Sequence, residues 1–399
     1  MTVLLPTLSL TDMKDIYFDN SATTKISDGA KNKMIEVMEK TFGNPSSLHK
    51  LGLEAEKAMT LARGTILSSL GIMRGVSGEL VFTSGGTEAN NLAIMGVVNS
   101  KSRRGNERIL TTQGEHSSVE NVLLELEKKG FEIVRVPTKD GELDLDFVRN
   151  NAQGCILATF MYVNNETGAL YDVKSAFDIV REKSPLAVCH SDCVQAYMKT
   201  RVSKKTTGAD LISISAHKVN GAKGVGALYV DPNIIKTKRI SPIVYGGGQE
   251  FGYRSGTENV YGIAAFGQAV KEHCASLSEE IDYMGELKEY IISALDSLDG
   301  VRVNKPKKSV CHIINVTAEG IRSETLLHFL SSLGIYVSSG SACSSNGAHK
   351  ASPSLIAFGL SADEADSSVR ISLCPQNTKD EADALIDGIK QALSKLARK

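Results

Sequence analysis

The chain has 399 residues, of which 42% are hydrophobic and 23% are charged, and its formal net charge is -1. This length predicts two or three domains, and a charge near zero excludes a bulk attraction to nucleic acid or to an anionic membrane. We therefore expect no direct binding of nucleic acid. No run of 18 apolar residues occurs, and the N-terminus lacks the basic start and small-residue cleavage site of a secretory signal, so neither a membrane span nor export is expected.

The cysteines are scattered along the chain and their number is odd. They are Cys155, Cys189, Cys193, Cys274, Cys311, Cys343 and Cys374. This usage does not fit a disulfide framework, and it predicts a reducing cytoplasmic location in which at least one thiol is available for chemistry.

Short apolar runs alternate with helical patterns over roughly the first 260 residues. Several runs are apolar nearly throughout, which is typical of strands covered by helices on both faces. We expect strands at residues 79–83, 108–112, 132–137, 155–161, 186–191, 210–215 and 225–230, with helices at 87–98, 117–129 and 173–183. The alternation predicts an α/β domain with a mostly parallel sheet.

The alternation ends near residue 260. Helical patterns follow at residues 261–276 and 279–298, then strand-like runs at 311–316 and 369–373, and a charged final helix at 378–399. These elements predict a second, smaller α+β domain. We therefore expect a large domain over residues 15–260 and a small C-terminal domain over residues 261–399, which residues 1–14 join.

Open α/β sheets bind ligands at the carboxyl ends of their strands, and polar residues follow the first two predicted strands. Gly86 and Thr87 open a helix, where backbone amides, a hydroxyl group and the helix N-terminus can bind an anion. A glycine turn capped by Thr87 is the alternative. His116 follows the second strand, where it can stack on a flat cofactor or simply satisfy a helix start.

Three later strand ends carry further candidates. Asn165 follows one strand, and Asp192 and Gln195 follow the next. After the sixth strand come Ser215, His217 and Lys218, followed by a glycine-rich stretch, and a lysine in this place can form a Schiff base. Hydrogen bonding within a turn explains Asn165 equally well. An isolated lysine before a glycine loop is usually a solvated surface residue.

The sequence around the fifth strand also contains Cys189, His190 and Cys193, which invites interpretation as a zinc site. Alternation along a strand directs Cys189 and His190 to opposite faces, and no second ligand pair stands nearby. We expect no metal site.

Taken together, an anion-binding turn, a stacking ring, a carboxylate and a lysine follow successive strand ends. Pyridoxal 5'-phosphate (PLP) requires this set, because its phosphate, ring, ring nitrogen and aldehyde each need one of these groups. The smaller domain adds Cys343 within a run of small residues, where His349 and Lys350 can favour the thiolate. A buried small side chain in a loop is the alternative for Cys343.

Seven segments, in order along the chain, resemble the NifS/IscS-like cysteine desulfurases, which are fold-type I PLP enzymes with the aspartate aminotransferase-like fold. They are residues 17–24, 43–47, 83–91, 163–168, 215–218, 254–257 and 338–344. Each motif alone is weak, and the seven in register are specific. Ala222, residues 249–253 and Cys374 depart from the usual family pattern.

The resemblance implies a role for each candidate around the cofactor. Lys218 would hold PLP as a Schiff base, Asp192 would pair with the ring nitrogen, and Gln195 would pair with the ring hydroxyl. His116 would stack on the ring and belong to the catalytic residues. The phosphate would be bound by Gly86, Thr87, Ser215, His217 and, from the neighbouring subunit of a homodimer, Thr257.

The resemblance also implies the reaction, which is conversion of L-cysteine to L-alanine. Asn165, which would also contact the cofactor, and Arg370 would hold the substrate carboxylate, with Asn44 nearby. Cys343 would take the sulfur as a persulfide and pass it to an acceptor protein, either an iron–sulfur cluster scaffold or a tRNA-thiolation enzyme. The rival hypotheses are a selenocysteine lyase or aminotransferase of this fold, a non-catalytic scaffold, and a zinc-binding regulator.

Overall fold

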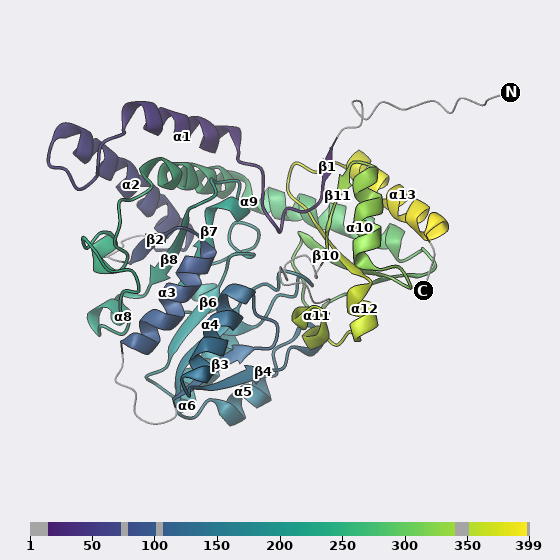
Figure 1. The fold of residues 1–399 in the computed structure, drawn as a ribbon, viewed down its shortest axis with the longest axis horizontal. Helices are drawn as coiled ribbons and strands as arrows, with labels where there is room; N and C mark the ends of the chain where they lie inside the picture. Colours follow the sequence, from purple (N-terminus) through teal and green to yellow (C-terminus); the bar gives the residue numbers. More distant parts are fainter. Residues whose placement is uncertain (1–14, 73–78, 101–106, 340–350, 397–399) are drawn as a thin grey trace.

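The computed structural model describes residues 15–72, 79–100, 107–339 and 351–396. Figure 1 shows a large α/β part and a smaller α+β part side by side, with helix α9 running from one into the other. The predicted fold class is confirmed by this architecture and by its sheet.

The large part is built on a seven-stranded sheet in the order β2-β8-β7-β6-β5-β3-β4. The strands are β2 (Leu80–Thr83), β3 (Arg108–Thr112), β4 (Glu132–Val136), β5 (Cys155–Met161), β6 (Val188–Asp192), β7 (Leu211–Ser215) and β8 (Gly226–Val230). Strand β8 is antiparallel to both neighbours, and the remaining pairs are parallel. Because β2 therefore runs in the same direction as β7, the carboxyl ends of β2, β3, β5, β6 and β7 share one edge of the sheet.

Helices cover both faces of this sheet, which explains why its central strands read as apolar throughout. All seven residues of β5 are buried, with Phe160 in one hydrophobic cluster and Leu157 in the other. The helices are α1 (Asp28–Lys40), α2 (Lys50–Ser69), α3 (Gly86–Asn99), α4 (Ser117–Lys128), α5 (Leu145–Asn151), α6 (Val173–Lys183), α7 (Lys204–Thr207) and α8 (Pro232–Lys236), with 3₁₀ turns η1 (Lys139–Gly141), η2 (Ala216–Lys218) and η3 (Glu250–Gly252).

The smaller part contains a four-stranded antiparallel sheet in the order β12-β13-β10-β9 and a parallel pair, β1-β11. The strands are β9 (Val301–Val303), β10 (Ile313–Ala318), β12 (Ser338–Ser339), β13 (Ser368–Ser372), β1 (Ile16–Tyr17) and β11 (Ile335–Tyr336). The helices are α10 (Ser323–Ser332), α11 (Pro353–Phe358), α12 (Ala362–Asp366) and α13 (Lys379–Lys395). Strand β13 carries Arg370 toward the large part.

Helix α9 (Val260–Leu295) is continuous over 36 residues, so the expectation of two separate helices in this region is wrong. No glycine or proline interrupts the chain at residues 276–279, where the two patterns were divided. Phe266 and Val270 pack in the core of the large part, whereas Leu287 and Ile291 pack in the core of the smaller part. The domain division at residue 260 stays a prediction. Among the described helices, none combines the length and apolarity needed to cross a membrane.

Candidate active site

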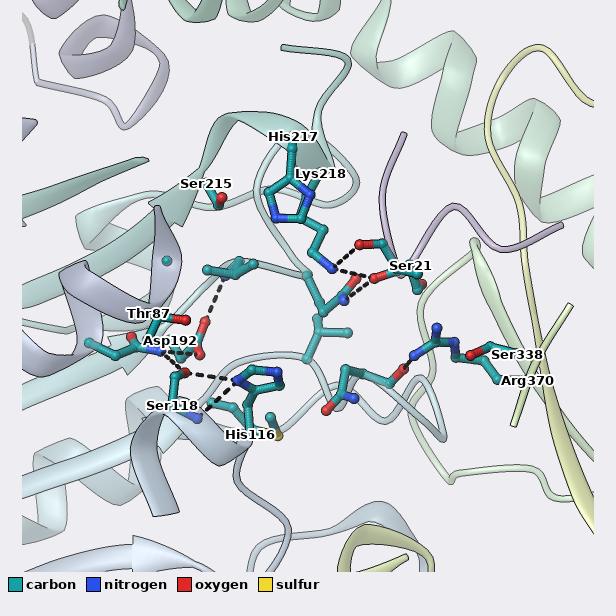
Figure 2. A pocket seen from close by; sticks show the side chains of 18 residues that line it. Ser21, Thr87, His116, Ser118, Asp192, Ser215, His217, Lys218, Ser338 and Arg370 are labelled. Atoms are coloured by element: carbon teal, nitrogen blue, oxygen red, sulfur yellow. Dashed lines mark hydrogen bonds between the residues drawn. The ribbon is translucent and has the colours of Figure 1, made fainter. Parts of the chain in front are cut away.

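A cavity of about 310 Å³ lies at the carboxyl edge of the large sheet, facing the smaller part (Figure 2). The structure brings ten of the residues predicted from sequence into its wall: Gly86, Thr87, His116, Asn165, Asp192, Gln195, Ser215, His217, Lys218 and Arg370. Sequence reasoning assigned no role to the other polar residues of the wall, which are Ser21, Asn90, Ser118 and Ser338.

One end of the cavity is suited to an anion. Gly86 begins α3, and a side chain there would place its Cβ 2.8 Å from Val194 Cγ2, so glycine is needed for this close packing. The first amides of α3 have no partner within the helix, and the helix N-terminus is electropositive. Ser215, the last residue of β7, has a buried Oγ with no hydrogen-bond partner among the described residues.

His217 lies beside this anion-binding end. Its Nδ1 is 3.2 Å from Thr23 Oγ1. Burial, together with the nearby positive charge of Lys218, lowers the pKa of His217 to about 4. The ring is therefore neutral at pH 7, and it acts as a hydrogen-bonding group rather than as a cation.

Asp192 forms the floor of the cavity, since it is the last residue of β6. Its Oδ2 accepts a hydrogen bond from Asn90 Nδ2 at 2.7 Å, and its Oδ1 accepts one from the backbone N–H of Val194 at 2.9 Å. Asn90 also donates to Ser118 Oγ at 2.8 Å. The two hydrogen bonds hold the carboxylate in one orientation at the sheet edge.

His116 stands across from Asp192 as the N-cap of α4. Its Nδ1 accepts a hydrogen bond from the backbone N–H of Ser118 at 3.2 Å and lies 2.8 Å from Ser118 Oγ. Burial lowers the pKa of His116, and Lys218 lowers it further, while Asp192 opposes the change. When a neutral imidazole accepts a hydrogen bond at Nδ1, its proton lies on Nε2.

Lys218 ends the η2 turn that follows β7, and Figure 2 shows its side chain extending into the cavity. Its Nζ donates to the backbone carbonyls of Ser21 and Ala22. Gln195 Nε2 donates to the same Ser21 carbonyl at 2.8 Å, which leaves its buried Oε1 without a partner among the described residues. Residues 17–24 belonged to a motif that indicated the family, but the motif gave no signal that its backbone would hold the lysine.

Arg370 closes the cavity from the smaller part. Its Nη1 donates to the backbone carbonyl of Asn165 at 2.9 Å, and its Nη2 donates to Asp19 Oδ1 at 2.8 Å. Its Nε is buried and has no partner among the described residues. A guanidinium fixed in this way can present its remaining N–H group to a carboxylate.

Two of the predicted site residues that the structure describes do not line this cavity. Asn44 is exposed before α2, where its Oδ1 accepts the backbone N–H of Ser46 at 2.9 Å. Thr257 lines a separate cleft beside Ser84. Cys343 lies outside the described residues.

The sequence suggested zinc only at Cys189, His190 and Cys193, and the described residues contain no cluster of three or more metal-binding side chains. His190 is fully buried, with Nδ1 2.8 Å from Thr159 Oγ1 and Nε2 2.9 Å from Ser213 Oγ. The two ring nitrogens of His190 therefore link β6 to its neighbours β5 and β7.

The cavity fits PLP on the chemistry of its side chains. The unpartnered Ser215 Oγ and the start of α3 can bind a phosphate. The unpartnered Gln195 Oε1 can accept from a ring hydroxyl, and the fixed Asp192 carboxylate can accept from a protonated ring nitrogen. Lys218 supplies the amine. Each functional group of the cofactor thus has a matching group in the wall.

Comparisons with known proteins agree with this chemistry. The family described as "Aminotransferase class-V" matches residues 16–385. A NifS/IcsS protein homolog of Lactobacillus delbrueckii subsp. bulgaricus is 39% identical over 96% of this chain and 98% of its own length. The cysteine desulfurase IscS of Methanosarcina thermophila is 35% identical over 97% of this chain and 94% of its own length. A solved NifS-like protein superimposes with a TM-score of 0.88 at 34% identity, covering 96% of this chain and all of the other.

Proposed function

This chain belongs to the class-V aminotransferase family, within the NifS/IscS-like cysteine desulfurases, and we propose that it converts L-cysteine to L-alanine at the Lys218 cavity. Enzymes of this family use PLP. The observation that carries the proposal is the arrangement of Lys218, Asp192 and Arg370 around one cavity. These residues provide an amine, an acceptor for a ring nitrogen and a carboxylate-binding group.

The wall assigns a place to each part of the cofactor and substrate. Asp192, Gln195 and His116 would hold the PLP ring, while Gly86 and Ser215 with their neighbours Thr87 and His217 would hold its phosphate. When bound, PLP supplies an electron sink for the bonds at the Cα of an amino acid. Arg370 and Asn165 would orient the substrate carboxylate, and Lys218 Nζ would hold and move the proton at the substrate Cα.

Cys343 would take the sulfur. Its thiolate would attack the sulfur of L-cysteine, so that a sulfur–sulfur bond forms as the carbon–sulfur bond breaks, which leaves a persulfide on Cys343. The electron pair of the broken bond would stay with the carbon skeleton, whose Cβ would take up a proton to give L-alanine. Ser338, in the cavity wall, stands five residues before Cys343. Five residues span at most ~17 Å, so covalent geometry allows Cys343 to reach the cavity.

The direct test is incubation of the purified, PLP-loaded protein with L-cysteine in the presence of a thiol reductant. We expect equal amounts of L-alanine and sulfide and, when the reductant is left out, a trapped persulfide on the peptide that contains Cys343. Formation of pyruvate or of a transaminated product, without sulfide, would contradict the proposed reaction.

We also propose that the active form is a homodimer. Large apolar side chains are exposed near Asn44 and Thr257, the two described site residues that do not line the cavity: Phe42 is 72% exposed, Leu48 93% and Tyr245 77%. A second copy would cover these side chains and bring Thr257 to the partner's phosphate site.

Light scattering tests the dimer. The wild type should be dimeric, and the double variant Phe42→Asp, Leu48→Asp should be monomeric and bind PLP more weakly. Leu186 is 71% exposed before β6, away from this surface, so Leu186→Asp is the matched control and should stay dimeric. A fully active wild-type monomer would contradict the proposal.

The sulfur on Cys343 would then pass to an acceptor protein, which we propose to be an iron–sulfur cluster scaffold or a tRNA-thiolation enzyme. The membership in the NifS/IscS-like family supports this step. Loss of the Cys343 persulfide on mixing with a purified acceptor, measured by mass spectrometry, tests it. The cytoplasmic location stays a prediction.

A further inference from the structure

Lys199 is buried behind the cavity and is not explained by the mechanism above. It follows Gln195 by four residues, in the turn that leaves β6. Its side chain is 6% exposed, and its Nζ has no hydrogen-bond partner among the described residues. Met198, just before it, has a φ of 53°, a left-handed conformation that residues other than glycine rarely adopt. The backbone thus adopts an unfavourable conformation at Met198, directly before the lysine whose amine lies inside the protein.

Among the described residues, the charged and titratable groups with the main electrostatic influence on Lys199 are cations and thiols, and none is a carboxylate. These groups are Lys218 in the cavity wall, Arg370 on β13, and the thiols of Cys374 and Cys311 from the smaller part. Burial raises the pKa of Cys374, and raises the pKa of Cys311 to about 11, so both are neutral thiols at pH 7.

The two histidines near Lys199 are also uncharged. Burial lowers the pKa of His312 well below its ordinary value and the pKa of His217 to about 4. Burial, reinforced by the charge of Lys218, lowers the pKa of Lys199 itself to about 7. The amine therefore changes its charge near neutral pH, and no acidic partner in the described part of the chain stabilises its ammonium form.

Two carboxylates already stand near the positive charges of the cavity. Arg370 is already paired with Asp19 at 2.8 Å, and Asp192 contributes a carboxylate opposite Lys218. A substrate carboxylate entering at Arg370 adds a negative charge that these pairs do not balance. Lys199 is a buried group nearby that can gain a positive charge.

We propose that Lys199 is a proton-linked positioning residue, which takes up a proton when a carboxylate binds at Arg370 and thereby strengthens the binding of that carboxylate. The proposal rests on the proposed function only for the place where the carboxylate binds. An anion nearby favours the charged form of a lysine, and by thermodynamic reciprocity the charged lysine favours the anion. Affinity for carboxylates should then fall as pH rises through neutrality, because the lysine loses its charge.

The test uses the PLP-loaded protein and propionate, which has the carboxylate of the substrate but neither its amine nor its thiol. Affinity is measured from pH 6 to pH 9 by the change in cofactor absorbance, and proton uptake is measured by calorimetry in buffers of different ionisation enthalpy. For wild type we expect the Kd to rise by about tenfold across neutrality, which corresponds to a rise of about one unit in the pKa of Lys199 when propionate binds. We also expect net proton uptake on binding near pH 7.5.

Two substitutions separate charge from packing. Lys199→Arg keeps a permanent charge and should bind propionate tightly at every pH, without proton uptake. Lys199→Met should bind about tenfold more weakly at low pH and match the wild type at high pH. A merely structural lysine would instead give two variants with lowered stability and an unchanged pH profile, which would overturn the proposal.

Two control variants complete the experiment. Lys288 is also buried, but its Nζ donates to Ser309 Oγ at 3.0 Å and to the Val310 carbonyl at 2.7 Å, so Lys288→Met should keep the wild-type pH profile. Burial raises the pKa of Glu115 to about 8 near Asp192, and Glu115→Gln removes any contribution of this acid to the profile. If the profile vanishes in Glu115→Gln and persists in Lys199→Met, the proposal is wrong. Failure to form L-alanine would overturn the proposed function alone, since propionate binding needs no turnover.

Discussion

The substitution Asp192→Asn removes one negative charge from the cavity and keeps the shape of the side chain. Asp192 Oδ1 accepts from the backbone N–H of Val194, which an asparagine carbonyl can do equally well. Asn90 Oδ1 is buried without a partner among the described residues, so a flipped Asn90 amide can accept from the new Nδ2. We therefore expect the variant to fold and the loss to fall on the cofactor.

The magnitude follows from the interaction that is removed. A hydrogen bond between a carboxylate and a protonated ring nitrogen contributes about 1.5–3 kcal/mol. Since each 1.4 kcal/mol is tenfold in an equilibrium constant, the Kd for PLP should rise about 10- to 150-fold. Absorbance titration of the apoprotein with PLP measures this change, and thermal unfolding of the apoprotein shows that the scaffold is intact.

Asp210→Asn is the matched control, because Asp210 is also hydrogen-bonded and adjoins a strand of the same sheet. Its carboxylate accepts from Arg181 Nη2 at 3.0 Å and from the backbone N–H of Cys189 at 2.9 Å, and it lies just before the amino end of β7, at the opposite edge. PLP affinity should stay near the wild-type value. Equal PLP affinity in Asp192→Asn and wild type, or equal weakening in both variants, would refute the role of Asp192.

Three further changes probe other parts of the site. Lys218→Ala should abolish the covalent attachment of PLP, and borohydride reduction of the wild type should label the peptide containing Lys218; a label on another lysine would contradict the assignment. Cys343→Ser should still bind PLP and change its absorbance with L-cysteine while releasing almost no sulfide, whereas Cys374→Ser should keep most of the activity. Glu115→Gln should have a higher unfolding temperature than the wild type, and the difference should grow from pH 5 to pH 8. The reason is that the folded wild type retains the Glu115 proton up to about pH 8, whereas the unfolded chain releases it above about pH 4.5. A difference that does not change with pH would contradict this linkage.

The sequence predicted the sheet and most of the cavity because both depend on local order. β3 and β5 begin and end where their apolar runs do, and Thr87, His116, Asp192 and Lys218 follow strand ends in chain order. The carboxyl ends of strands that run in one direction meet at one edge, so a list of residues after strands becomes a list of neighbours.

Contacts between distant segments could not be predicted in this way. Glu250 lies in the stretch that departs from the family pattern, and only the folded structure shows what this residue does. Its carboxylate accepts hydrogen bonds from Arg63 Nη2 at 2.8 Å and from the backbone N–H of Phe82 at 2.7 Å. The carbonyls that hold Lys218 and the Asp19 partner of Arg370 likewise come from the N-terminal segment. Neither propensity nor periodicity carries information about such pairs.

Burial, which the sequence shows only indirectly, also decides which groups in the site are charged. His116 and His217 are both titratable by composition, yet burial lowers the pKa of each, and burial raises the pKa of Glu115 to about 8. The other ionisable side chains of the wall are Asp192, Lys218 and Arg370, which is paired with Asp19. Because burial holds the two histidines of the wall neutral, the electrostatic effect of the cavity rests on these few side chains, and for this reason one buried amine behind the wall is expected to alter the binding of an anion.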